Sequence, residues 1–139
     1  MNGLQAVQQA FLWVSDCSLN VPNGTALSAF EQSNLNIYTI SFVGDLKAEW
    51  KSLVWLGNSE QTAAGPDGNR FAHDSTLVMV WGDAALVGTT TFDTFSTGSI
   101  EGSDTYSFGV LLCETGGDMA CGSPTPASNL GSTGCSFCP

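Results

Sequence analysis

Hydrophobic and polar residues repeat along the chain with two different periods, one helical and one extended. Between residues 3 and 15, apolar residues recur at spacings of three and four while most of the glutamines fall elsewhere. This spacing is typical of one face of an amphipathic helix. The pattern therefore predicts an N-terminal helix, with Asn2 as its N-cap and with Leu4, Val7, Phe11 and Val14 on its buried face.

A second helix is predicted over residues 46–56. Asp45 stands where an N-cap belongs, Leu46, Trp50 and Leu53 form a stripe, and Gly57 occupies the position that follows many helix ends. A strand over the same segment, with alternate residues from Trp50 to Leu56 on one face, is the open alternative, because a short apolar run does not distinguish the two. A capping-box pattern at residues 28–31 also favours a short helix there.

Strand patterns dominate the rest of the chain. The clearest covers residues 35–43, where β-branched residues are dense and Tyr38, Ile40 and Phe42 share the face expected to meet the core. Three further strands are expected at residues 76–81, 85–95 and 105–113, and the short polar links between them favour antiparallel hairpins. Residues 58–74 are polar and glycine-rich, which indicates a long surface loop.

These elements predict an α+β fold: an N-terminal amphipathic helix packed on a mostly antiparallel sheet, with an irregular, cysteine-linked C-terminal tail. An all-β sandwich is the alternative. We expect one domain, with residues 1–114 as its globular core and residues 115–139 as its Gly/Ser/Pro-rich tail, and no internal repeat. The layout is similar in broad outline to the globular part of pilin and pseudopilin subunits, and this resemblance implies a pilin-like filament subunit.

Charge narrows the range of partners. Only 12% of the 139 residues are charged, and thirteen acidic residues outnumber Lys47, Lys51 and Arg70, which gives a formal net charge of −10. The electrostatic field of a negatively charged protein repels nucleic acids and anionic lipid surfaces, whereas binding of cationic partners remains possible. No apolar run is long enough for a membrane span, and the N-terminus lacks the features of a signal peptide. A soluble chain is expected.

The cysteines favour structural disulfides and, through them, an extracellular or cell-surface location. A bridge between Cys113 and Cys121 would staple the start of the tail, and a bridge from Cys17 to Cys135 or Cys138 would tie the first helix to the C-terminus. The alternative is a zinc site formed by Cys113, Cys121, Cys135 and Cys138, because the last two have the two-residue gap of a zinc ligand pair.

No catalytic motif stands out. His73 is the only histidine, and it is expected to bond to Asp74 or to solvent. Carboxylate pairs such as Asp83 with Asp93, or Glu101 with Asp104, leave an acid–base enzyme open, although spacing alone selects none of them. No cofactor is expected, but a loose calcium-loop pattern is formed by Asp67, Asn69 and Asp74.

The sequence therefore predicts a non-enzymatic structural or assembly subunit of an extracellular filament or virus particle, which self-associates or joins other subunits. The alternative is a secreted module that binds carbohydrate or another ligand. In that case Trp55 would stack on a sugar ring, and Asp67, Asn69 and Asp74 would supply polar contacts from the loop.

Overall fold

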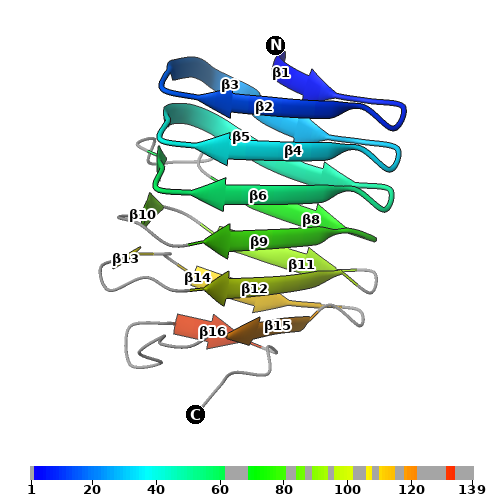
Figure 1. Cartoon of the computed structure of the whole chain (residues 1–139). Helices are drawn as coiled ribbons and strands as arrows, with labels where there is room; N and C mark the ends of the chain where they lie inside the picture. The colour runs from blue at the N-terminus through cyan, green and yellow to red at the C-terminus, as the bar shows by residue number, and fades with distance from the viewer. Residues whose placement is uncertain are drawn as a thin grey trace.

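The chain folds as an all-β parallel solenoid of about four turns (Figure 1). The computed structural model describes residues 2–61, 69–80, 84–86, 89–93, 96–101, 106–107, 110–114, 118–121 and 131–133. Within these residues there is no helix, and every strand pair is parallel. The described part of the chain accordingly contains no helix that could cross a membrane.

Two stacked sheets form the sides of the solenoid. The front sheet in Figure 1, sheet B, stacks β2 (Phe11–Ser15), β4 (Asn34–Tyr38), β6 (Leu53–Gly57), β9 (Thr76–Val80), β12 (Thr97–Glu101) and β15 (Asp118–Cys121). The other, sheet A, contains β1 (Asn2–Ala6), β3 (Ser18–Ala29), β5 (Ser41–Glu49), β7 (Glu60–Gln61), β8 (Arg70–His73), β10 (Ala84–Leu86), β11 (Thr89–Asp93), β13 (Tyr106–Ser107), β14 (Val110–Cys113) and β16 (Gly131–Thr133).

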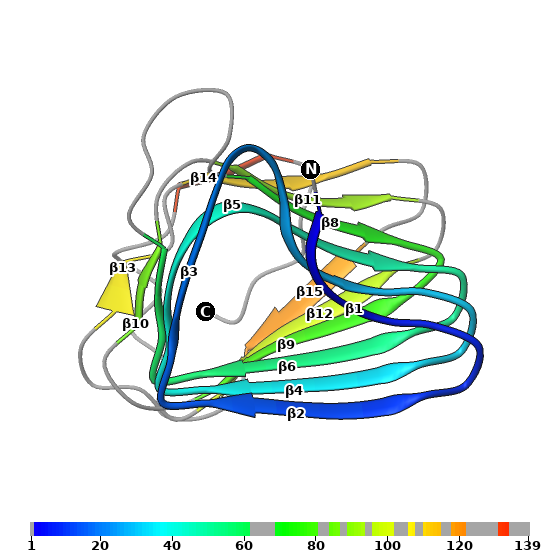
Figure 2. The ribbon, with the colours of Figure 1, turned by 90° about the horizontal axis from the view of Figure 1, so that it is seen from above.

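Seen from above, the successive coils superpose, and the long strands of sheet A curve around the side opposite sheet B (Figure 2). The bend in β5 requires Gly44, whose φ is 119°. A Cβ at this position would lie 2.7 Å from the carbonyl oxygen of Val21 in the neighbouring strand. Glycine is the residue that tolerates this backbone conformation and this close approach.

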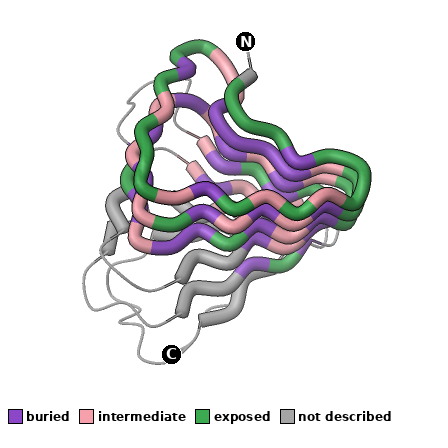
Figure 3. Tube along the Cα trace, turned by 45° about the horizontal axis from the view of Figure 1, so that its top comes forward, coloured by how far each residue is buried: buried purple, intermediate pink, exposed green. Residues whose placement is uncertain are grey.

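The core is a stack of columns, because equivalent residues of successive coils align in register. Along each strand one side chain points into the lumen and the next points out, which gives the alternating burial seen in Figure 3. Burial of the aliphatic columns supplies the main stabilising term. One inward column of sheet B contains Leu12, Leu35, Val54, Leu77 and Gly98, and one of sheet A contains Ala6, Ala29, Ala48, Ala72, Phe92 and Cys113.

A ladder of serines joins the coils at the corner that precedes sheet B. The backbone N–H of Ser33 donates to Oγ of Ser52 at 3.2 Å, Ser52 N–H donates to Ser75 Oγ at 3.1 Å, and Ser75 N–H donates to Ser96 Oγ at 3.2 Å. All four serines are buried. The ladder therefore satisfies corner amides that water does not reach.

We expect Ser52→Ala to destabilise the protein by about 1–3 kcal/mol, because it leaves the buried amide of Ser33 without its acceptor. Urea unfolding measures the change. Ser18→Ala is the matched control, since Ser18 is exposed and its replacement should stay within about 0.5 kcal/mol of wild type. Equal effects of the two substitutions would contradict a structural role for the ladder.

The helix predicted over residues 3–15 is wrong. The segment forms β1 and β2, joined by a turn in which Gln8 and Gln9 have φ values of 57° and 63°. The helical spacing of apolar residues arises because two short strands of period two are joined by this turn. Of the expected buried face, Leu4, Val7 and Phe11 are exposed, and Val14 alone is buried.

The helix over residues 46–56 is also wrong, and so is the short helix near residue 28, which lies within β3. Residues 46–49 end β5, Trp50 and Lys51 form a left-handed turn, and β6 follows. The strand alternative is right for β6, where Val54 and Leu56 are buried, but Trp50 is 60% exposed at the corner.

The α+β class and the likeness to pilins, which depended on a helix lying across a sheet, are therefore both overturned.

The sandwich alternative and the antiparallel hairpins are overturned as well, because all the described strands pair in parallel. Strands do occupy parts of residues 35–43, 76–81, 85–95 and 105–113. Between the last two of these segments a polar link was expected, but β12 (Thr97–Glu101) lies there. Thr39, with φ 55°, separates β4 from β5. Past Glu114, where regular structure was expected to stop, β15 pairs with β12 and β16 pairs with β14.

The chain also contains the internal repeat that the sequence pattern did not reveal. Each serine of the ladder begins a segment that enters sheet B, and the serines are 19, 23 and 21 residues apart. The uneven spacing conceals the repeat because the corners differ in length while the strands keep their register.

Candidate functional site

The outer surface of sheet B carries a group of exposed aromatic side chains on three consecutive strands. We call this surface, formed by Phe11, Trp13, Asn34, Asn36, Tyr38 and Trp55, the aromatic face. Phe11 is 66% exposed and Trp13 is 61% exposed, both on β2, while Tyr38 on β4 and Trp55 on β6 are 39% and 37% exposed. Exposed aromatic rings gathered on one sheet face are a common feature of binding surfaces.

The alternation of the strands creates this face. In β2 the side chains of Leu12 and Val14 are on the core side, so Phe11 and Trp13 point outward. The same alternation in β4 buries Leu35 and Ile37 and turns the two asparagines outward. Each outward residue then aligns with its counterpart on the next coil.

The register places two tryptophans in one outward column. Trp13 pairs with Asn36, and Asn36 pairs with Trp55, so an amide separates the two indole side chains. With a strand spacing near 4.8 Å, the Cα atoms of the two tryptophans lie roughly 10 Å apart. The amide of Asn36 donates to Oδ1 of Asn34 at 2.9 Å, which fixes the orientation of the two asparagines.

The aromatic face is uncharged. Every outward residue of β2, β4 and β6 is aromatic, aliphatic, amide, hydroxyl or glycine, although the chain as a whole has a formal charge of −10. Aromatic rings offer apolar surface, and the asparagine amides offer both donors and acceptors. This combination suits a flat, neutral ligand that is rich in hydroxyl groups.

The predicted binding residues that the structure describes lie on different parts of the solenoid. Trp55 lies on the aromatic face, Asp74 lies in the turn between β8 and β9, and Asp67 is outside the described residues. Asn69 has a structural contact: its side-chain oxygen accepts a hydrogen bond from the Thr89 N–H at 3.0 Å. Of the loop residues expected to act together with Trp55, the two that are described, Asn69 and Asp74, do not lie on the aromatic face.

The structure describes the side chains of two cysteines, Cys17 and Cys113. Cys113 is buried and disulfide-bonded. Cys17 is an exposed free thiol at the corner between β2 and β3, so the bridge expected from it to the tail is not formed. The side chain of Cys121 is not described, and Cys135 and Cys138 lie outside the described residues.

His73 lies on β8 rather than in a loop, and its Nδ1 is 2.7 Å from Oδ1 of Asp93 on β11. Asp93 therefore takes the place expected for Asp74. Of the acid pairs considered from the sequence, Asp83 and Asp104 lie outside the described residues. Among the described side chains no group of three or more potential ligands is arranged to hold a metal ion.

Of the four aromatic residues of this face, the sequence predicts a binding role for Trp55 alone, and Phe11, Trp13 and Tyr38 are not among the predicted binding residues. Phe11 was assigned to a buried helical face, and Tyr38 to a core-facing strand. The signal that would have found the face is the alternation of aliphatic residues with other residues after each corner, which marks the residue between two aliphatic ones as outward.

Comparisons with protein-family models, with curated proteins and with solved structures found no match. The chemistry of the aromatic face is therefore inferred from its own residues.

Proposed function

We propose that this protein is a non-catalytic binding module and that its aromatic face binds a neutral, extended polysaccharide. The observation that carries this proposal is the column Trp13–Asn36–Trp55, in which two exposed indoles are separated by one amide. The Cα atoms of the two tryptophans are about 10 Å apart, about the length of a disaccharide unit in an extended chain. Alternate sugars would stack on the rings, and the amides would bond to hydroxyl groups.

Charge supports a neutral ligand. The acidic chain repels polyanions at long range, and the aromatic face itself offers no charged group to pair with one. The rigidity of the stacked sheets also favours binding, because the rings are held on paired strands and lose little conformational freedom.

The location that fits this proposal is extracellular or at the cell surface. The disulfide of Cys113 favours an oxidising compartment, because structural disulfides are rare in the reducing cytosol.

The test compares binding to cellulose, chitin and xylan by depletion from solution, and to soluble oligosaccharides by calorimetry. We expect Trp13→Ala and Trp55→Ala each to weaken binding by about tenfold, which corresponds to about 1.4 kcal/mol. The double variant should bind at background level. Phe71→Ala is the matched control, because Phe71 is 36% exposed on sheet A, away from the aromatic face.

Two results would contradict the proposal. One is that the wild-type protein binds none of these neutral glycans. The other is that the double variant binds a glycan as tightly as wild type does.

A structural or assembly subunit is the second candidate, and the same uncharged surface favours it. Elsewhere the acidic surface of one copy would repel another copy, but two aromatic faces could meet without like-charge repulsion. Sedimentation velocity distinguishes the two functions: association that is lost in the double tryptophan variant, without any glycan binding by wild type, would favour the assembly subunit.

A further inference from the structure

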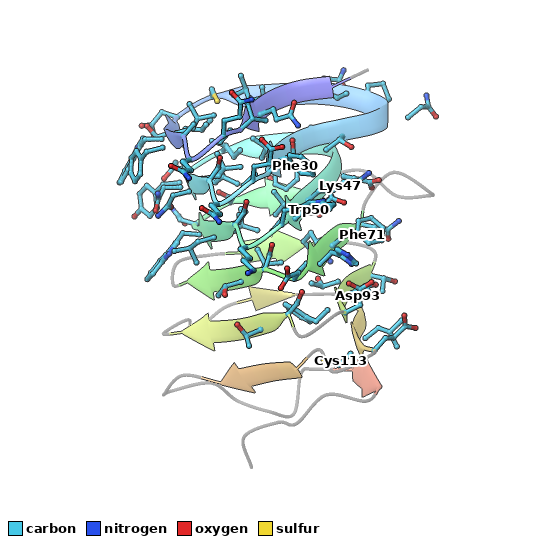
Figure 4. All side chains as sticks on the ribbon, turned by 90° about the vertical axis from the view of Figure 1, so that its right-hand side faces the viewer. Phe30, Lys47, Trp50, Phe71, Asp93 and Cys113 are labelled. Atoms are coloured by element: carbon cyan, nitrogen blue, oxygen red, sulfur yellow. The ribbon has the colours of Figure 1, made fainter. Side chains whose placement is uncertain are left out.

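A recess lies at the corner where sheet A turns into sheet B, and none of its lining residues belongs to the aromatic face. Its volume is about 600 Å³, within the range of small-molecule sites. Trp50, which is 60% exposed, forms part of its wall, and the Trp50 ring packs edge-on against Phe30 at a centroid distance of 5.8 Å (Figure 4). This contact holds the ring while leaving much of it open to a ligand.

The recess is built by one backbone conformation repeated on successive coils. Two consecutive left-handed residues occupy the turn in each of three coils: Gln8–Gln9, Glu31–Gln32 and Trp50–Lys51, with φ values from 56° to 63°. Backbone hydrogen bonds join these turns, from Gln9 N–H to Glu31 O and from Gln32 N–H to Trp50 O, each at 2.9 Å. The side chains of the three turns are therefore stacked along the corner.

The hydrogen-bonding groups of the recess suit a sugar. Its walls include the amides of Gln8, Gln9 and Gln32, and the Gln9 amide donates to Gln32 Oε1 at 3.2 Å. Amides beside an aromatic ring can bond to hydroxyl groups while the ring contacts the apolar face of a pyranose.

The charges of the recess favour a cation. Glu31 lies in the turn one coil before Trp50 and Lys51, and Asp74 lies in the turn one coil after them. Two carboxylates and one ammonium group therefore line the recess. No ion pair of Glu31, Lys51 or Asp74 is formed within the described part of the chain. Carboxylates beside the face of an exposed tryptophan attract ammonium groups, and the net charge of −10 strengthens that attraction at long range.

We propose that this corner recess binds a sugar residue that carries a protonated amine, a 2-amino-2-deoxy pyranose with its amine free. The ring contacts Trp50, the ammonium group pairs with the Glu31 carboxylate, and the glutamine amides bond to the hydroxyls. The Lys51 ammonium opposes this ligand through like-charge repulsion. The site is separate from the aromatic face and does not depend on the function proposed for that face.

The test uses two ligands that differ mainly in charge: oligomers of glucosamine and the corresponding oligomers of N-acetylglucosamine, measured by calorimetry and by Trp fluorescence. All measurements use the Trp13→Ala, Trp55→Ala double variant as the starting protein, so that the aromatic face does not contribute to binding. We expect the glucosamine oligomers to bind at least tenfold more tightly, with an affinity that falls as salt is added. The N-acetyl oligomers serve as the matched neutral ligand. Equal or tighter binding of the N-acetyl oligomers would overturn the proposal.

Three variants assign the binding to the recess. Glu31→Gln and Trp50→Ala should each weaken binding of the glucosamine oligomers by about tenfold, whereas Lys51→Gln should strengthen it several-fold because it removes the repelling charge. Glu114→Gln, which removes an exposed carboxylate outside the recess, is the control for net charge. Weaker binding in Lys51→Gln, or an equal loss in Glu31→Gln and Glu114→Gln, would show that the recess does not recognise the amine.

Discussion

Replacing Phe92 with alanine should destabilise the protein by about 3–5 kcal/mol, and adding Gly98→Leu should recover much of that loss. Phe92 is fully buried in the lumen, directly opposite Gly98. A Cβ on residue 98 would lie 2.2 Å from the Phe92 ring, so the ring occupies the space that a side chain at 98 would need. The large and the small residue therefore compensate each other.

The preceding coil supports this reasoning. Phe92 aligns with Ala72, and Gly98 aligns with Leu77, so the double variant copies a small–large pair that the solenoid already contains. Gly98→Leu alone should be destabilising, because it overpacks the lumen against the ring. Urea unfolding under non-reducing conditions gives the four free energies of the double-mutant cycle.

Thr97→Leu is the control for added volume at this strand, since Thr97 is exposed and its neighbour Gly98 is buried. It should change stability by about 0.5 kcal/mol or less. Additive effects of Phe92→Ala and Gly98→Leu, with no recovery in the double variant, would show that the two residues do not share one space.

Arg70→Met should destabilise the protein by about 2–4 kcal/mol, because it leaves two buried acceptors, on Gln61 and Thr90, without their donor. The Arg70 side chain is fully buried in the lumen. Its Nε donates to Thr90 Oγ1 at 2.7 Å, and its Nη1 donates to Gln61 Oε1. Gln61 in turn donates to the carbonyl of Gly44 at 2.7 Å, so the network joins three coils.

The pH dependence of the Arg70→Met effect has a defined sign. Burial lowers the pKa of Arg70 well below its usual value, to about 10, and Asp45 opposes this shift. The folded chain therefore holds this proton less tightly than the unfolded chain does, and the cost of burying the charge is fully present below pH 10. Above about pH 10 that cost declines, so the stability gap between wild type and Arg70→Met should widen.

Lys47→Met is the control for Arg70→Met, because Lys47 lies on the outer surface of sheet A, with its Nζ 6.0 Å from the centroid of the Phe71 ring. It should cost about 1 kcal/mol or less. A similar loss in the two variants, or a gap that narrows above pH 10, would contradict the role given to the buried guanidinium.

The sequence predicts the strands better than it predicts their arrangement. Local alternation identified the strand character of 76–80 and 110–113, because period two is a property of each segment by itself. Parallel pairing depends on residues about twenty positions apart, and no local pattern contains that information. The turn at Trp50 and Lys51 adopts a left-handed backbone without glycine, so the strongest sequence signal for a corner is missing there.

The candidate site was predictable only in part. The sequence predicts that Trp55 could stack on a sugar ring, and Trp55 is exposed although the helix expected around it does not exist. The helix expected over residues 3–15 gives no reason to place Trp13 on a binding surface. The exposure of Trp13 follows from stacking β2 on β4, an arrangement that the residues of β2 alone do not specify. Arg70, assigned to a polar loop, is buried for the same kind of reason.

The serine ladder gives the solenoid a direction of growth. Each corner amide is satisfied by a hydroxyl from the coil that follows it in sequence, from Ser33 to Ser52 and onward to Ser96. Synthesis runs from the N-terminus, so the newest corner on a growing chain holds a donor whose acceptor has not yet been made. Each new coil supplies the acceptor for the corner amide of the coil before it. The most recently made, C-terminal coil therefore stays the least stable part of the nascent protein.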